Sequence, residues 1–169
     1  MDFSEIKSRL SKTPDILQTI LRDISEDQAK WKPSEQKWSI VEVLNHLLDE
    51  EKSDFRKRID LTLNHPGEEW PSFEPEKWAA EKKYNKRNLD DSLDDFIKER
   101  LKSIIWLEGL HSADWDLYYD HPKAGKLAAG DLLAAWLAHD YLHLRQIFML
   151  MAEYVEVISE PYSTRYARP

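Results

Sequence analysis

The sequence predicts an all-α protein whose amphipathic helices form a bundle. Only four of its 169 residues are glycine, and it is rich in leucine, glutamate and lysine, which favour helices. Several long segments also repeat apolar residues with the period of a helix rather than alternating as strands do. Amphipathic helices bury their apolar faces against one another, so a helix bundle is the expected architecture.

The first expected helix covers residues 14–25. Thr13 is suited to cap its N-terminus, and Pro14 stands at the first helical position, where a missing N–H removes no helical hydrogen bond. The following stretch, residues 26–38, is polar and contains a proline. It is expected to be a connector.

The second expected helix begins after Ser39 and ends near Leu63. Ser39 and Glu42 form the pattern of a capping box, in which each side chain accepts a hydrogen bond from the backbone N–H of the other residue. The sequence NHPG at 64–67 is expected to end this helix.

The second half of the chain predicts two more long helices. A short helix is expected within residues 74–84 and a third long helix within 89–110. Residues 111–128 are expected to form a loop, the fourth long helix covers about 131–154, and the tail from about 156 to 169 is expected to be irregular. The expected apolar face of the third helix consists of Leu93, Phe96, Ile97, Leu101, Ile104, Ile105 and Leu107.

Chain length and charge favour one soluble domain over residues 1–169. A chain of this length buries about 70% of the surface that its unfolded form exposes. The net charge of −8 argues against nucleic acid as a partner, because phosphate binding needs a cationic surface. No stretch is apolar and long enough to cross a membrane, and the N-terminus lacks an apolar signal segment, so a cytoplasmic protein is expected.

Two histidines of the fourth helix, His139 and His143, stand one turn apart on one helical face. They continue the stripe of apolar residues expected to face the core, so each needs a hydrogen-bond partner or a metal. Two imidazoles leave a zinc-like ion undercoordinated, and His46 of the second helix is the candidate third ligand. Histidines that hydrogen-bond among themselves or within the core remain an alternative. His65, His111 and His121 fall in expected loops, with His121 a candidate to line the mouth of the site.

Three further residues are candidates for supporting roles. Asp140 lies about 100° around the helix from His139, so it is expected either to hold another histidine or to bond across a helix interface. Gln146 faces the same way as His143 and either contacts a metal-bound water or forms a hydrogen bond within the bundle. Glu50 follows His46 by one turn and could act as a general base if buried, although a solvated glutamate is the simpler expectation.

Other metal and phosphate chemistries do not fit the sequence. A di-iron carboxylate bundle needs two Glu-x-x-His pairs, and the comparable pair here begins with Asp140. The metalloprotease motif H-E-x-x-H lacks its glutamate, because Asp140 follows His139. Gly125 and Gly130 have the spacing of a phosphate loop, but an acidic residue follows where lysine is needed. The chain contains no cysteine, which excludes disulfides, a cysteine nucleophile and thiolate metal sites.

Two motifs lie far apart in the sequence: WKP at 31–33 with WSIVEVLNHL at 38–47, and HDYLHLRQI at 139–147. Together they resemble the DinB/YfiT-like family of metalloenzymes. The resemblance implies an up-down-down-up four-helix bundle, often a homodimer, in which three residues hold a divalent ion. Carried over position by position, the ligands are His46, His139 and His143.

The resemblance also implies a class of activity. Characterised members of the family are thiol-dependent transferases and isomerases that use low-molecular-weight thiols such as bacillithiol or mycothiol. The expected function is therefore that of a thiol S-transferase or a hydrolase, in which the metal activates an external thiol or water for attack on a small electrophilic substrate. The metal is expected to be zinc, nickel, iron or manganese, because imidazole binds each of them.

The alternative is a non-catalytic bundle, stabilised by metal, that binds a small molecule or a protein partner. Such a structural site would be closed by a fourth protein ligand and would lack an adjoining cleft.

Overall fold

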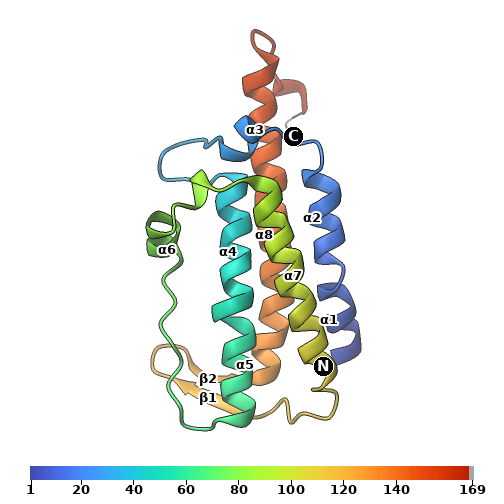
Figure 1. Cartoon of the computed structure of the whole chain (residues 1–169), viewed down its shortest axis with the longest axis vertical. Coiled ribbons are helices and arrows are strands. Elements are labelled where there is room, and N and C mark those ends of the chain that lie inside the picture. The colour runs from blue at the N-terminus through green and yellow to red at the C-terminus, as the bar shows by residue number, and fades with distance from the viewer. Residues whose placement is uncertain (168–169) are drawn as a thin grey trace.

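The computed structural model describes residues 1–167, and its long helices form the four rods of a bundle (Figure 1). The rods are, in chain order, α1 (Phe3–Leu10) with α2 (Thr13–Leu21), α4 (Ile40–Ser53) with α5 (Phe55–Asn64), α7 (Leu89–Glu108), and α8 (Ala129–Ser159). The first rod runs up in the view of Figure 1, the second and third run down, and α8 runs up again. The predicted all-α, up-down-down-up bundle is confirmed.

The connections carry short elements that the sequence analysis did not resolve. These are α3 (Glu26–Lys30), η1 (Tyr84–Lys86), β1 (Tyr118–His121) and β2 (Gly125–Ala128), and η2 (Arg165–Ala167) follows in the tail. The short helix expected within residues 74–84 is confirmed as α6 (Pro75–Glu81). Strands β1 and β2 form an antiparallel hairpin in which Tyr118 lies opposite Ala128. The prediction that residues 111–128 form a loop is therefore wrong in part. The hairpin turn ends at Gly125, whose φ of 73° favours glycine.

Several predicted helix boundaries are also wrong. The expected second helix is interrupted at Asp54, which has φ −120° and ψ −93° and separates α4 from α5. Helix α8 continues to Ser159, so the predicted irregular tail begins later than residue 156. Residues 168–169 of that tail lie outside the described residues. Helix α1 was missed because its sequence has few apolar residues, and its packing against α7 and α8 stabilises it instead.

The buried face of α7 agrees only in part with the predicted one, since Leu93, Phe96 and Leu107 are buried as expected. Leu101 and Ile105 are 59% and 60% exposed, whereas Arg100 and Ser103 are buried. Apolar residues surround much of this helix, so periodicity alone did not identify the face that packs against α4. The buried positions of Arg100 and Ser103 are tolerated because both side chains find polar partners on other helices.

A buried polar layer divides the apolar core into two clusters. Arg100 of α7 donates hydrogen bonds to Glu51 of α4 at 2.6–2.8 Å and to Asp140 of α8 at 2.6–2.8 Å. Thr13 of α2 donates to Asp140 at 2.6 Å, and Trp136 Nε1 donates to Glu51 at 2.7 Å. All four rods therefore meet in one network, which holds α4 and α8 in a fixed register.

The start of α4 is fixed by the predicted capping box. The Ser39 hydroxyl accepts a hydrogen bond from the Glu42 N–H at 3.3 Å, and the Glu42 carboxylate accepts one from the Ser39 N–H at 2.8 Å. Ser39 is fully buried and its hydroxyl also donates to Asn85 Oδ1 at 2.7 Å. The box therefore sets where α4 begins and joins it to η1.

We expect Ser39→Ala to lower the free energy of unfolding by about 1–2 kcal/mol, because it removes a helix cap and leaves buried groups without a partner. Urea unfolding followed by circular dichroism measures the change. The control is Ser25→Ala, which removes the exposed cap of the five-residue α3 and should cost less than about 1 kcal/mol. Equal losses in the two variants would contradict the prediction.

Among the described residues, no helix combines the length and the apolar character that crossing a membrane requires.

Candidate metal centre

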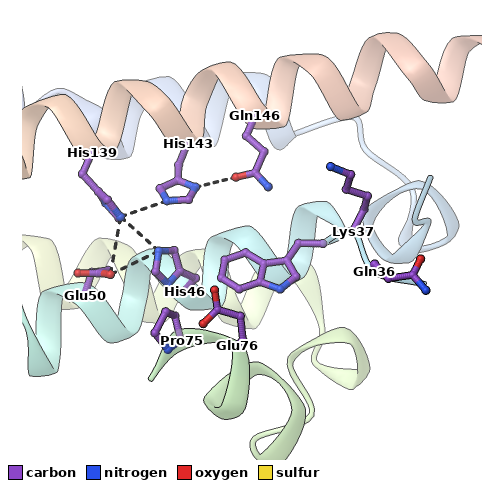
Figure 2. A pocket seen from close by; sticks show the side chains of 10 residues that line it. Gln36, Lys37, His46, Glu50, Pro75, Glu76, His139, His143 and Gln146 are labelled. Carbon is purple, nitrogen blue, oxygen red and sulfur yellow. Dashed lines mark hydrogen bonds and ion pairs between the residues drawn. The ribbon is translucent and has the colours of Figure 1, made fainter. Parts of the chain in front are cut away.

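Three histidines from two helices meet at one end of a cleft (Figure 2). His139 Nε2 lies 3.2 Å from His46 Nε2 and 3.1 Å from His143 Nε2. One ligand atom from each of the three residues lies within 4.8 Å of the other two. The structure thus brings together the three histidines that the sequence analysis singled out as metal ligands.

The helices explain why the three rings converge. His139 and His143 lie one turn apart on α8, and α4 packs directly against α8 with His46 on the facing side. Trp38 packs on the His46 ring with 4.9 Å between centroids, and Phe55 packs edge-on against His139 at 5.3 Å. Aromatic side chains thus pack against two of the three imidazoles.

The contacts among the three rings fit a shared cation better than hydrogen bonds. An imidazole Nε2 offers one lone pair or one N–H, so His139 Nε2 can form a hydrogen bond with only one of its two neighbours. Ligand nitrogens about 2.0–2.1 Å from a tetrahedral zinc ion would lie about 3.3–3.4 Å apart. The observed separations of 3.1 and 3.2 Å are close to that value. The donor set therefore fits a divalent metal.

Burial keeps the three imidazoles in the neutral form that binds metals. Burial, with the neighbouring histidines, lowers the pKa of His46 to about 3. Burial and His143 lower the pKa of His139 to about 4, and burial also lowers the pKa of His143. At neutral pH each ring carries a single proton and keeps a lone pair on its other nitrogen, which is the state that metal ligation requires.

Gln146 fixes the orientation of one ligand. Its Oε1 lies 2.8 Å from His143 Nδ1 (Figure 2). With the proton on Nδ1, His143 donates this hydrogen bond, and the lone pair on Nε2 points toward the other two rings. Of the two roles expected for Gln146, the structure shows the hydrogen bond within the bundle, and its partner is a candidate ligand.

Glu50 is buried beside the histidines, so the expectation of a solvated glutamate is wrong. Its side chain is 7% exposed, and Oε1 lies 3.4 Å from His46 Nε2 and 3.7 Å from His139 Nε2. Burial, together with the nearby carboxyl group of Asp54, raises the pKa of Glu50 to about 9. Sequence reasoning could place Glu50 on the His46 face but could not see that α8 covers it.

Asp140 points away from the site. Its carboxylate accepts hydrogen bonds from Thr13 and Arg100, which lie on other helices. Of the two expectations for Asp140, the structure therefore shows the bond across a helix interface. Asp140 still adjoins His139 in sequence, so the buried polar layer holds the backbone on which that ligand stands.

The other three histidines lie away from the cluster. His65 and His111 are exposed in turns at the ends of α5 and α7. His121 lies in β1 and lines a separate cleft of about 420 Å³ with Trp70 and Tyr119. The expectation that His121 lines the mouth of the site is wrong, because the hairpin packs against α5 rather than beside His46.

A cleft of about 490 Å³ opens onto the three histidines. Its far wall comes from residues 36–38, which were expected to lie in a connector, and from the start of α6. Helix α6 is held there because Asp49 of α4 accepts hydrogen bonds from Lys82, at 2.6 Å, and from Tyr84. No spacing in the sequence relates these segments to the histidines. The cleft is lined by Gln36, Lys37, Trp38, His46, Glu50, Pro75, Glu76, His139, His143 and Gln146.

Comparisons with known proteins agree with this fold. A sequence profile of the DinB superfamily matches residues 9–147. The solved structure of YfiT from Bacillus subtilis superposes with a TM-score of 0.80 and 16% sequence identity, covering 90% of this chain and 87% of that one. YfiT is described as a probable metal-dependent hydrolase with an unusual four-helix bundle topology. No curated protein sequence matches the chain.

Proposed function

The chain belongs to the DinB superfamily, and from this premise we propose that it is a metal-dependent hydrolase acting on a small electrophilic substrate. The observation that carries the proposal is a buried carboxyl group, Glu50, beside three neutral imidazoles at the end of an open cleft. The description of YfiT as a probable metal-dependent hydrolase supports the same reaction class.

His46, His139 and His143 would hold the metal. Within residues 1–167, the candidate ligand set comprises these three histidines, which leaves a coordination position open toward the cleft. A divalent ion there would act as a Lewis acid and lower the pKa of a water or thiol that it binds. Zinc, nickel, iron and manganese all remain compatible with three imidazole ligands.

Glu50 and Gln146 supply the remaining chemistry. Glu50 is placed to donate a proton to a leaving group, because it is buried where the nitrogens converge and its raised pKa favours the protonated carboxyl group at neutral pH. Gln146 holds the His143 ring in one orientation. The apolar ring of Trp38 covers His46 and keeps bulk water from that side of the site.

The open cleft argues against the alternative of a purely structural metal site. A structural site would use four protein ligands and need no adjoining space. Here about 490 Å³ adjoins the histidines, which is within the range of small-molecule sites. An external low-molecular-weight thiol could enter the same space, so thiol transfer is the second reaction to be tested. A homodimer stays a prediction.

The test is a hydrolysis screen of zinc-loaded protein on small esters, amides and lactones, with metal-free protein as the reference. We expect zinc-dependent turnover, and Glu50→Gln should lower kcat by about 10²–10⁴-fold while keeping its zinc, because it removes only the ionisable carboxyl group. The matched control is Glu76→Gln, which changes another carboxylate that lines the same cleft but forms no hydrogen bond or ion pair with the three histidines, and which should retain most activity.

Three outcomes would change the proposal. Loss of zinc from Glu50→Gln would make Glu50 a fourth ligand and favour the structural site. Products that carry an added low-molecular-weight thiol would establish a transferase instead of a hydrolase. No zinc-dependent reaction with water or thiol would refute the enzymatic role.

A further inference from the structure

The cleft at the histidines continues into a second, smaller one. A space of about 170 Å³ shares Lys37, Trp38 and Gln146 with the larger cleft. We call the part beside the three histidines the histidine lobe and the smaller space the apolar lobe. The apolar lobe is lined by Pro33, Lys37, Trp38, Gln146, Met149, Leu150 and Glu153. Because three residues border both spaces, one elongated ligand can occupy them together.

The two lobes lie along one face of α8. His139, His143, Gln146 and Leu150 follow each other at spacings of three and four residues and therefore form one stripe on that helix. At 1.5 Å per residue, Leu150 lies about 10 Å along the helix axis from His143. A ligand that reaches both lobes must therefore be extended and about that long.

The walls of the lobes differ in chemistry. Imidazoles and the Glu50 carboxyl group surround the inner end of the histidine lobe. Leu150, Met149, Pro33 and the Trp38 ring give the apolar lobe a mainly hydrocarbon wall, and Met149 is 55% exposed with its flexible thioether at the surface. The Glu153 carboxylate also lines this lobe, which disfavours a ligand arm that ends in an anion.

The border between the lobes is polar. The Oε1 atom of Gln146 accepts a hydrogen bond from His143, so its amide nitrogen remains available as a donor. Lys37 contributes an ammonium group. Both are suited to a carbonyl oxygen of a ligand that crosses from one lobe to the other. A ligand with a polar carbonyl head and a neutral apolar arm therefore matches the sequence of histidine lobe, polar border and apolar lobe along the cleft.

We propose that the substrate is an elongated amphipathic carbonyl compound, with its electrophilic head at the three histidines and an unbranched apolar arm in the apolar lobe. This inference rests on the proposed function, since it assigns the substrate class of that same site. The apolar lobe selects for arm length, and Met149 is its specificity-determining residue.

The test uses zinc-loaded protein and alkyl hydroxamates of increasing chain length, from acetohydroxamate to decanohydroxamate, with binding measured by titration calorimetry below micelle-forming concentrations. The hydroxamate head binds zinc, so the short members report on the metal site alone. We expect affinity to change little for the shortest chains and then to rise about twofold to fourfold per added methylene group once the chain reaches the apolar lobe.

Two exposed residues provide a matched pair of variants. Met149→Glu should abolish the gain with chain length and leave acetohydroxamate binding unchanged, because it places a charge in the apolar lobe. Phe148→Glu introduces the same charge at the neighbouring position, which is 50% exposed and does not line either lobe, and should behave like the parent protein.

The possible results distinguish a failure of the inferred substrate class from a failure of the proposed metal site. Acetohydroxamate binding without any gain for longer chains would overturn the inference and leave the metal site standing. An equal effect of Met149→Glu and Phe148→Glu would also overturn it, since the arm would then bind the general surface of α8. Failure of the protein to take up zinc, seen directly by elemental analysis, would refute both the proposed function and the inference.

Discussion

Replacing Arg100 with methionine is expected to lower the free energy of unfolding by about 3–5 kcal/mol, because it leaves buried carboxylates without their cation. Glu51 and Asp140 are 0% and 1% exposed, and the Arg100 guanidinium donates to both. It also donates to the Leu10 carbonyl at 2.9 Å. Methionine occupies a similar volume, so the loss reports on charge and hydrogen bonding rather than on a cavity.

Urea unfolding of the purified variants measures this effect. The matched control is Arg56→Met, which removes another arginine paired with a glutamate, in this case Glu99. Glu99 keeps a second cation, because Lys102 Nζ donates to its Oε2 at 2.9 Å, so the carboxylate stays paired and the loss should stay within about 1 kcal/mol. If Arg100→Met lowers the free energy of unfolding by less than about 1 kcal/mol, the buried polar layer does not hold the four rods together.

His139→Ala is expected to abolish metal binding. His139 Nε2 lies within 3.2 Å of both other ligand nitrogens, so its removal leaves two imidazoles with no third donor between them. Losing a group that only orients a ligand costs about 10–100-fold in metal affinity, and losing the ligand itself should cost more. Elemental analysis should find about one equivalent of a divalent metal in the parent protein and little in the variant.

The analysis must use tag-free protein, because a histidine tag binds the same metals. His111→Ala is the matched control: it removes an exposed imidazole outside the cluster and should leave the metal content unchanged. A parent protein that is metal-free and takes up neither zinc nor nickel would contradict the proposed metal site. The three histidines would then be core residues that hydrogen-bond among themselves, and the enzymatic proposal would lose its main support.

The long helices could be predicted from the sequence because helical periodicity and capping residues depend only on neighbours within a few positions. The capping box of Ser39 and Glu42 appears in the structure as the sequence predicted. The short helices α1 and α3 were not predicted, because they contain eight and five residues, which is too few to be stable alone. Leu10 of α1 and Ala29 of α3 are fully buried against other parts of the bundle, so tertiary packing stabilises both helices.

The spacing of His139 and His143 by itself determined that two imidazoles share a face of one helix, and the helical period placed His46 and Glu50 together on another. Only the tertiary structure decided that these faces meet, that Glu50 is buried and that Asp140 binds Arg100 instead of a histidine. The physical reason is that periodicity shows which residues share a face but not what lies opposite it. Whether a charged side chain is buried depends on the partner that another helix supplies.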